Sequence, residues 1–153
     1  MYQKYLDPII EEFTTGEYYS EVYKAKQEFF EKAGIVYEED PEFEQRMCIF
    51  MDWYLFERNL PGVDLPPIKY FYRKNKDKLS NEELSIYGDF CRTIHSIFRL
   101  KRVAWFGKGL VVLDLFSRKT FTVNDTEMNQ GFTRGDVFEA RLIPFRGSYE
   151  FSR

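Results

Sequence analysis

The chain has 153 residues and a mass of 18.5 kDa, which suits one compact domain or a domain with a small docked annex. Hydrophobic residues make up 44% and charged residues 31%, so the composition excludes a disordered chain and a membrane-embedded one. The formal net charge is −3, but the charge is unevenly distributed: residues 1–60 hold 14 Asp and Glu against 6 Lys and Arg, and the rest of the chain is mildly basic. Such an asymmetry is typical either of a basic half that binds an acidic partner or of two halves that dock on each other.

The first part of the chain, residues 1–95, is predicted to be helical. Apolar residues recur every three or four positions from Tyr2 to Phe13, and again from about Glu17 to Ala33, with Gly34 at the position that ends a helix. Asp40-Pro41 is a typical helix start, because Asp accepts from free amides and Pro has no amide to satisfy. The helix that follows is apolar nearly all round, so we expect it at the centre of the bundle.

Two further helices are predicted after this one. Pro66-Pro67 precedes a short apolar stretch that includes Tyr70–Tyr72. Ser80 and Glu83 have the spacing of a capping box, which predicts a last helix from about Asn81 to His95. The helical region therefore holds about five helices.

From Ser96 onward the period of the apolar residues changes from 3.6 to 2, which predicts strands. Gly107-Lys108-Gly109 and Arg146-Gly147 are predicted as tight hairpin turns. The five expected strands lie near Ile97–Phe106, Leu110–Phe116, Thr120–Val123, Asp136–Ile143 and Ser148–Phe151. The predicted fold class is α+β: a helical bundle (residues 1–95) packed with a small five-stranded antiparallel β-barrel or curled sheet (residues 96–153), integrated as one unit.

Aromatic residues make up 19% of the chain, which predicts an aromatic-rich core. Cys48 and Cys91 each lie in an apolar stretch, so two buried, reduced thiols are expected rather than a disulfide framework. The N-terminal residues do not have the pattern of a secretory signal, and the longest apolar run is far too short to cross a bilayer. We therefore expect a cytoplasmic protein without a membrane partner.

Two stretches carry a resemblance. The first is Phe50–Phe56 followed by Leu60-Pro61-Gly62, and the second is Arg134-Gly135-Asp136 followed by Ala140–Pro144. Together they resemble a family of uncharacterised bacterial proteins that join a helical N-terminal region to a small β C-terminal region. Some members carry a SEC-C metal-binding tail, which the two Cys and one His of this chain do not provide. The resemblance implies the two-part layout and no activity.

The residue pattern does not predict catalysis, and we expect no catalytic residue, no cofactor and no bound metal. Asp52 lies mid-helix among large apolar side chains, where a structural buried carboxylate with hydrogen-bonding partners is favoured over a catalytic acid. Cys91 and His95 have a spacing that suits two metal ligands on one helix, but the chain has no further Cys or His motif to complete a site. His95 is explained by a favourable place at a helix C-terminus.

Binding is the remaining function class. Residues 96–153 hold 10 basic and 6 acidic residues, and the basic ones alternate with aromatic ones near Trp105. Basic residues interleaved with aromatic ones on a small barrel are typical of single-stranded nucleic-acid binding, but so small an excess favours a solvated sheet face toward the acidic helices. We therefore expect a non-enzymatic adaptor that binds another protein; the alternative is a nucleic-acid-binding accessory factor that uses the basic, aromatic face of the small barrel. The candidate binding residues are Arg99, Lys101, Arg102, Trp105, Lys108, Arg118 and Arg141.

Overall fold

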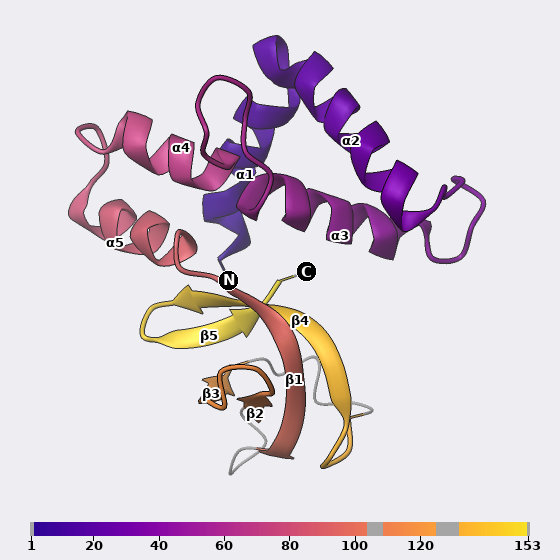
Figure 1. The fold of residues 1–153 in the computed structure, drawn as a ribbon. Coiled ribbons are helices and arrows are strands. Elements are labelled where there is room, and N and C mark those ends of the chain that lie inside the picture. Colours follow the sequence, from indigo (N-terminus) through magenta and orange to yellow (C-terminus); the bar gives the residue numbers. More distant parts are fainter. Residues whose placement is uncertain (1, 104–108, 125–131, 153) are drawn as a thin grey trace. The chain divides into compact units, whose positions relative to one another are not determined.

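The computed structural model describes residues 2–103, 109–124 and 132–152 (Figure 1). The chain divides into two compact units, Met1–Tyr87 and Gly88–Arg153, called the helical unit and the strand unit below. Among the described residues there are five α-helices and a five-stranded mixed sheet, so the α+β fold class is confirmed. The integration of the two regions into one unit stays a prediction.

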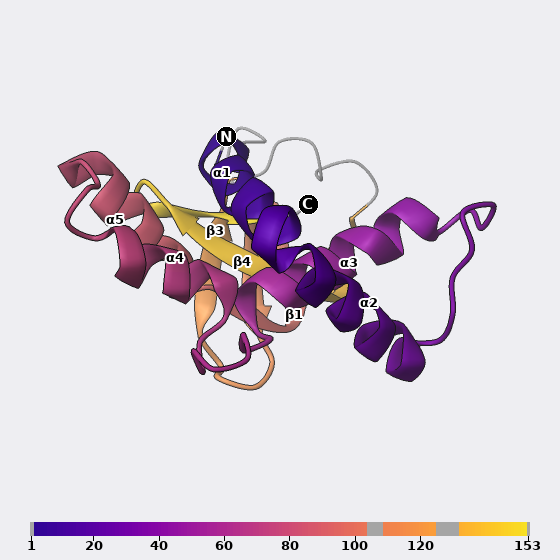
Figure 2. The ribbon, with the colours of Figure 1, turned by 90° about the horizontal axis from the view of Figure 1, so that it is seen from above.

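The helices follow the predicted order. Their bounds are α1 (Gln3–Thr14), the short 3-10 helix η1 (Gly16–Tyr18), α2 (Tyr19–Ala33), α3 (Phe43–Phe56), α4 (Pro67–Asn75) and α5 (Asn81–Phe90). Figures 1 and 2 show α2 and α3 joined by a long connection at one end of the pair.

Two helix starts were predicted from short motifs, with opposite outcomes. The capping box is confirmed: the Ser80 amide donates to Glu83 Oε2 (2.9 Å) and the Glu83 amide donates to Ser80 Oγ (3.3 Å). The start at Asp40 is wrong, because α3 begins at Phe43. The Asp40 carboxylate accepts instead from the Tyr37 amide behind it (2.8 Å), so it shapes the preceding loop rather than the helix.

Aromatic rings fill the interior of the helical unit, as predicted. The rings of Phe29 and Phe30 on α2 lie 5.7 and 6.0 Å from that of Phe50 on α3, at angles typical of packed aromatic pairs. α3 is nevertheless buried on one side only, since Cys48 and Ile49 are exposed. The prediction of two buried thiols is therefore wrong for Cys48, and Cys91 is only partly buried.

The strand unit contains β1 (Ile94–Val103), β2 (Leu110–Asp114), β3 (Thr120–Val123), β4 (Val137–Phe145) and β5 (Ser148–Phe151). Their pairings close on themselves in the order β1-β2-β3-β5-β4, with β4 paired back to β1. Four of the five pairings are antiparallel, but β3 and β5 run parallel, so a purely antiparallel sheet was a wrong prediction.

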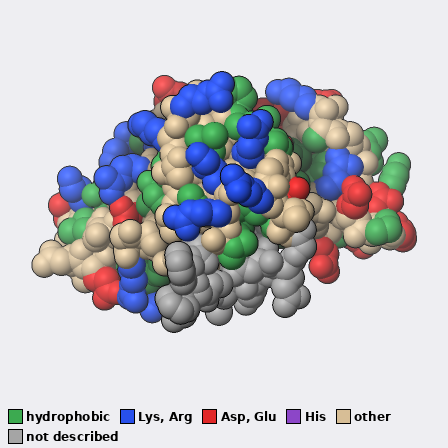
Figure 3. Space-filling model, turned by 90° about the horizontal axis from the view of Figure 1, so that it is seen from below, with side chains coloured by type: hydrophobic (Ala, Val, Ile, Leu, Met, Phe, Trp, Pro, Cys, Tyr) green, Lys and Arg blue, Asp and Glu red, His purple; other side chains and the backbone are tan. Residues whose placement is uncertain are grey.

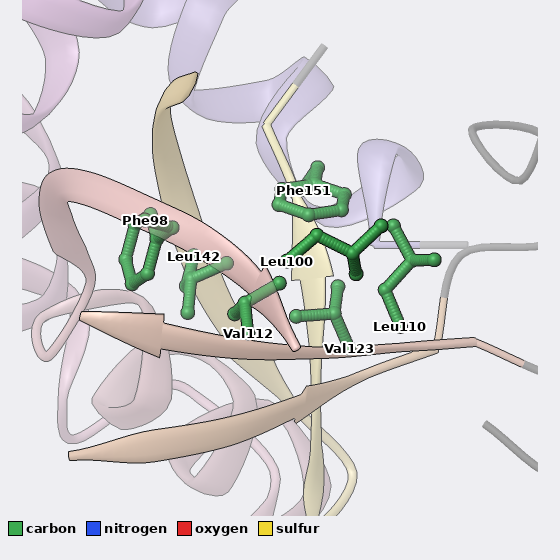
Figure 4. Packing of buried hydrophobic residues seen from close by; sticks show 7 residues of the cluster. All are labelled: Phe98, Leu100, Leu110, Val112, Val123, Leu142 and Phe151. Carbon is green, nitrogen blue, oxygen red and sulfur yellow. The ribbon is translucent and has the colours of Figure 1, made fainter. Parts of the chain in front are cut away.

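The inner face of this sheet is apolar and closely packed. Figure 4 shows its central cluster, which comprises Phe98, Leu100, Leu110, Val112, Val123, Leu142 and Phe151, all at most 2% exposed. Gly109 approaches a neighbouring strand so closely that a Cβ would lie 2.3 Å from the Val123 carbonyl oxygen, and its φ of +119° also favours glycine.

The strand boundaries correct one helix and confirm one turn. α5 ends at Phe90, and His95 lies on β1 opposite Arg141, not at a helix C-terminus. The Arg146-Gly147 turn is confirmed, because both residues have positive φ and connect the paired Phe145 and Ser148. The other predicted turn, at Gly107-Lys108, lies outside the described residues. In the part of the chain that the structure describes, every helix is too short or too polar to span a bilayer.

Candidate functional site

The strongest candidate site is the outer face of β1. Along this strand Phe98 and Leu100 point into the core and are buried. Because side chains alternate between the two faces of a strand, the residue before Phe98 and the residue after it point outward. Ile97 and Arg99 are exposed at these outward positions. An aliphatic side chain and a guanidinium therefore stand next to each other on the surface.

A β-bulge adds further positive charge to this face. The register between β1 and β2 shifts between Leu100 and Arg102, so Lys101 is the extra residue and Arg102 pairs with Val111. Arg102 thus returns to the outward side while Lys101 stays exposed. In the described part of the chain, none of Arg99, Lys101 and Arg102 has an ion-pair partner.

Strand β4 extends the face sideways. Val137 pairs with Arg99 and is 53% exposed, and Ile97 is 38% exposed. Below, "the β1 outer face" means Ile97, Arg99, Lys101, Arg102 and Val137. Figure 3 shows Lys and Arg side chains gathered on the surface with apolar side chains among them.

Charged neighbours border the β1 outer face. Arg134 is next to it, because the adjacent Gly135 amide donates to the Leu100 carbonyl (2.8 Å). Glu139, the partner of Ile97 across the strands, is a carboxylate on the same side and already lies 2.9 Å from His95 Nε2. The face is therefore predominantly basic.

The β2–β3 turn lies at the other end of β1. The Leu115 amide donates to the Ile97 carbonyl (2.9 Å), so the turn begins next to Ile97 and continues with Phe116. Phe116 is 76% exposed, and Arg118 follows it with a positive φ of 61°. The turn thus adds an exposed ring and a guanidinium beyond the end of the face.

A buried carboxylate, Asp114, holds this turn in place. Its oxygens accept from Ser96 Oγ (2.6 Å), from the Phe116 amide (3.0 Å) and from the Ser117 hydroxyl. Burial by itself raises the pKa of Asp114, which is 4% exposed, but these hydrogen bonds outweigh it and lower the pKa to about 2. Asp114 is therefore ionised at neutral pH. An Asp at a strand end with a Ser three positions later is the turn signal that predicts this arrangement.

The structure brings together only part of the predicted set. Arg99, Lys101 and Arg102 share the β1 outer face, and Arg118 lies in the β2–β3 turn. Arg141 does not belong to an exposed face: it is 6% exposed and donates to Thr93 Oγ1 (3.3 Å), so its predicted role is wrong. The candidates Trp105 and Lys108 lie outside the described residues. Ile97, Val137 and Phe116 were missed, because a search for charge does not select aliphatic residues.

The other candidates for chemistry are separated. Asp52 is partly buried on α3, and its structural role stays a prediction. Cys91 follows α5 and His95 lies on β1, so they do not share one helix. Among the described residues, no group of three or more His, Cys, Asp or Glu side chains has the arrangement of a metal site.

The helical unit uses its buried polar groups to join its own helices. Arg58, which follows α3, donates to Glu21 Oε1 (2.7 Å) and Glu28 Oε2 (2.8 Å) on α2. Burial lowers the pKa of Arg58, and the two carboxylates more than offset this and raise it. Tyr54 donates to the Phe13 carbonyl (2.8 Å), and burial raises its pKa to about 12. We attribute these contacts to stabilisation of the helical unit rather than to a binding or catalytic role.

The fold and the β1 outer face define a two-unit α+β protein with a basic and aliphatic sheet surface. The chain belongs to the family of unknown function DUF7986, whose family model it matches over residues 3–153. Comparison with curated proteins and with solved structures gave no match.

Proposed function

We propose that this protein is a non-enzymatic adaptor that binds another protein through the β1 outer face, and that the partner presents carboxylates beside apolar side chains. The observation that carries the proposal is the mixed composition of the face, where Ile97 and Val137 are exposed next to Arg99. Arginine and apolar side chains are common at protein interfaces, and opposite charges on the partner accelerate the encounter.

The pairing of β1 indicates how such a partner binds. β1 is paired with β2 on one side and with β4 on the other, so the backbone groups of both its edges are in use. Addition of a partner strand to β1 is therefore not available, and binding relies on side chains. Because the β1 outer face can bind only through its side chains, the charge and shape of these side chains determine which partner it binds.

The alternative, a nucleic-acid-binding accessory factor, has less support in the described residues. Single-strand binding requires exposed rings on which bases stack. Phe98 is buried in the core of the sheet, and Phe121 and Phe138 pack against that core. In the described part of the strand unit, the exposed large ring is Phe116 of the β2–β3 turn.

The proposed setting is the bacterial cytoplasm. The resemblance to uncharacterised bacterial proteins supports the source, and the two free cysteines support a reducing compartment, since an exposed thiol such as that of Cys48 is kept reduced there.

Capture from a lysate of the native cell, with and without nuclease, tests this proposal. The bait is the full chain, and the test variant is the double substitution Arg99→Glu with Arg102→Glu. The matched control is Lys76→Glu with Lys78→Glu, which makes the same charge change at exposed residues of the helical unit. We expect a captured protein that survives nuclease, is lost from the Arg99 and Arg102 variant, and is retained by the control.

Two outcomes would overturn the proposal. Equal capture by both variants would show that the β1 outer face is not used. Capture that depends on nucleic acid would favour the alternative, and fluorescence anisotropy with labelled RNA and DNA would then measure it. Three phosphate contacts predict that affinity falls about 20- to 40-fold between roughly 50 and 200 mM salt.

A further inference from the structure

The β1 outer face carries three cations and two aliphatic side chains, so an occupant must supply both carboxylates and apolar groups. The chain itself contains such a segment, in the connection between α2 and α3. Residues 34–42 hold four Asp and Glu and no Lys or Arg. Ile35 is 71% exposed and Tyr37 is 63% exposed, and Glu38 and Glu39 beside them are also exposed. Exposed apolar side chains are thus followed directly by exposed acidic ones here, whereas the β1 outer face combines apolar side chains with basic ones.

This segment, called the acidic loop below, is held in a defined conformation. Arg46 of α3 reaches back and donates to the carbonyl oxygens of Ala33 (2.6 Å) and Gly34 (2.7 Å). On the far side, the Asp40 carboxylate accepts from the Tyr37 amide (2.8 Å). A loop that is ordered before binding loses less conformational entropy on docking than a disordered one.

The acidic loop is also accessible from outside the helical unit. Figures 1 and 2 show the acidic loop projecting beyond the ends of α2 and α3. It therefore stands clear of its own helices, where another molecule can reach it.

We infer that the β1 outer face binds the acidic loop of a second copy of this chain; this inference rests on the proposed function and names the partner. The argument is charge complementarity: Glu38 and Glu39 meet Arg99 and Arg102, while Ile35 and Tyr37 cover the aliphatic residues. Each copy carries one loop and one face, so the contacts either pair reciprocally in a two-fold dimer or continue head-to-tail into a larger ring or an open chain. The interface is small, so association is weak and is reduced by salt.

Sedimentation velocity with the full chain tests the inference. We expect the wild-type sedimentation coefficient to rise over a concentration range of about 10 to 500 μM, and the rise to disappear in about 0.5 M salt. Two variants each lose one side of the contact: Glu38→Lys with Glu39→Lys disables the loop, and Arg99→Glu with Arg102→Glu disables the face. Each alone should remain a monomer.

An equal mixture of these two variants gives the sharpest result. In the mixture the intact loop of one variant meets the intact face of the other, and the Lys-bearing loop meets the Glu-bearing face with reversed but complementary charges, so we expect the mixture to associate as the wild type does. Association of two chains that are each monomeric alone also shows that both variants are folded. The chain that carries all four substitutions has reversed charges on both sides, and we expect it to associate again.

A matched control tests whether any loss of association is specific to the loop and the face. Lys76→Glu with Lys78→Glu should associate as the wild type does. A wild-type chain that stays monomeric would refute the inference, as would association that persists in both single-sided variants or a mixture that remains monomeric. The proposed function survives such a refutation if the lysate capture still yields a nuclease-resistant partner that depends on Arg99 and Arg102, so the two failures are distinguishable.

Discussion

The substitution Asp114→Asn removes the charge on which the β2–β3 turn depends. In the folded chain the pKa of this carboxyl is about 2, against an ordinary value of 3.8 when the chain is unfolded. One pKa unit corresponds to about 1.4 kcal/mol, so ionisation of Asp114 stabilises the fold by roughly 2 kcal/mol at neutral pH. Asparagine keeps the shape but accepts more weakly from Ser96 and Ser117, so we expect it to lose about this amount.

The pH dependence of this loss checks the reasoning. Because the folded pKa is depressed, the contribution of Asp114 is fully present above about pH 4 and is lost as the pH falls toward 2. Urea unfolding followed by circular dichroism, for both proteins from pH 7 to pH 3, should show a constant difference that narrows in the acid range. Ser96→Ala is a useful companion, with an expected loss of about 1 kcal/mol. A difference that is absent at pH 7, or that is the same at pH 3, would refute the account.

Four further substitutions have expected outcomes in denaturant unfolding. Gly109→Ala should destabilise by about 2 kcal/mol or more, because its Cβ meets backbone, whereas Gly147→Ala has only its positive φ against it and should lose less; equal losses would contradict this. Arg58→Met should cost about 2–4 kcal/mol, because it removes the cation that pairs with the mostly buried Glu21, whereas Glu28 keeps its ion pair with Lys32 (4.0 Å); an unchanged midpoint would show the Arg58 ion pairs to be dispensable. Tyr54→Phe should cost about 1 kcal/mol through the lost hydrogen bond to Phe13. The raised pKa of Tyr54 makes its contribution complete below pH 10 and lost toward pH 12, so alkaline unfolding should begin at higher pH in the variant.

The local sequence pattern predicted a strand or a helix start correctly where a single local interaction determines it. The bounds of β3 and β5 agree with the alternation of their residues. The Ser80 and Glu83 box works because its two partners are three residues apart and meet before any tertiary contact forms. The helix start predicted at Asp40 was wrong because its carboxylate can accept either from an amide before it in the chain or from an amide after it. The local pattern does not rank these two partners, and in the structure the carboxylate accepts from the amide before it.

Long-range contacts account for the rest of the differences. Ile94 and His95 continue the helical pattern of α5, but pairing of Ile94 with Leu142 and of His95 with Arg141 draws them into β1. The buried carboxylate Asp114 was missed for the same reason, because its donor Ser96 lies 18 positions away in the sequence.

For the candidate site, the sequence predicted which residues are charged but not which of them share an exposed face. Arg99, Lys101 and Arg102 were selected because they cluster in sequence, and the sheet keeps them together. Arg141 was selected by the same criterion, but burial removes it, and burial of a single arginine is not visible in local composition. Val137 enters the site only because it pairs with Arg99 from a strand nearly forty residues later.

The parallel contact that closes the sheet has a consequence for hydrogen exchange. In the described residues β3 and β5 share a single aligned pair, Val123 with Tyr149, and one further bond from the Asn124 amide to the Tyr149 carbonyl (2.7 Å). Every other pairing in the sheet holds at least four aligned residues. Transient opening should therefore start at this junction, and the Asn124 amide should exchange with solvent well before those of β1. The opened sheet would have β3 and β5 as free edges, and these edges are where two chains would first pair during aggregation.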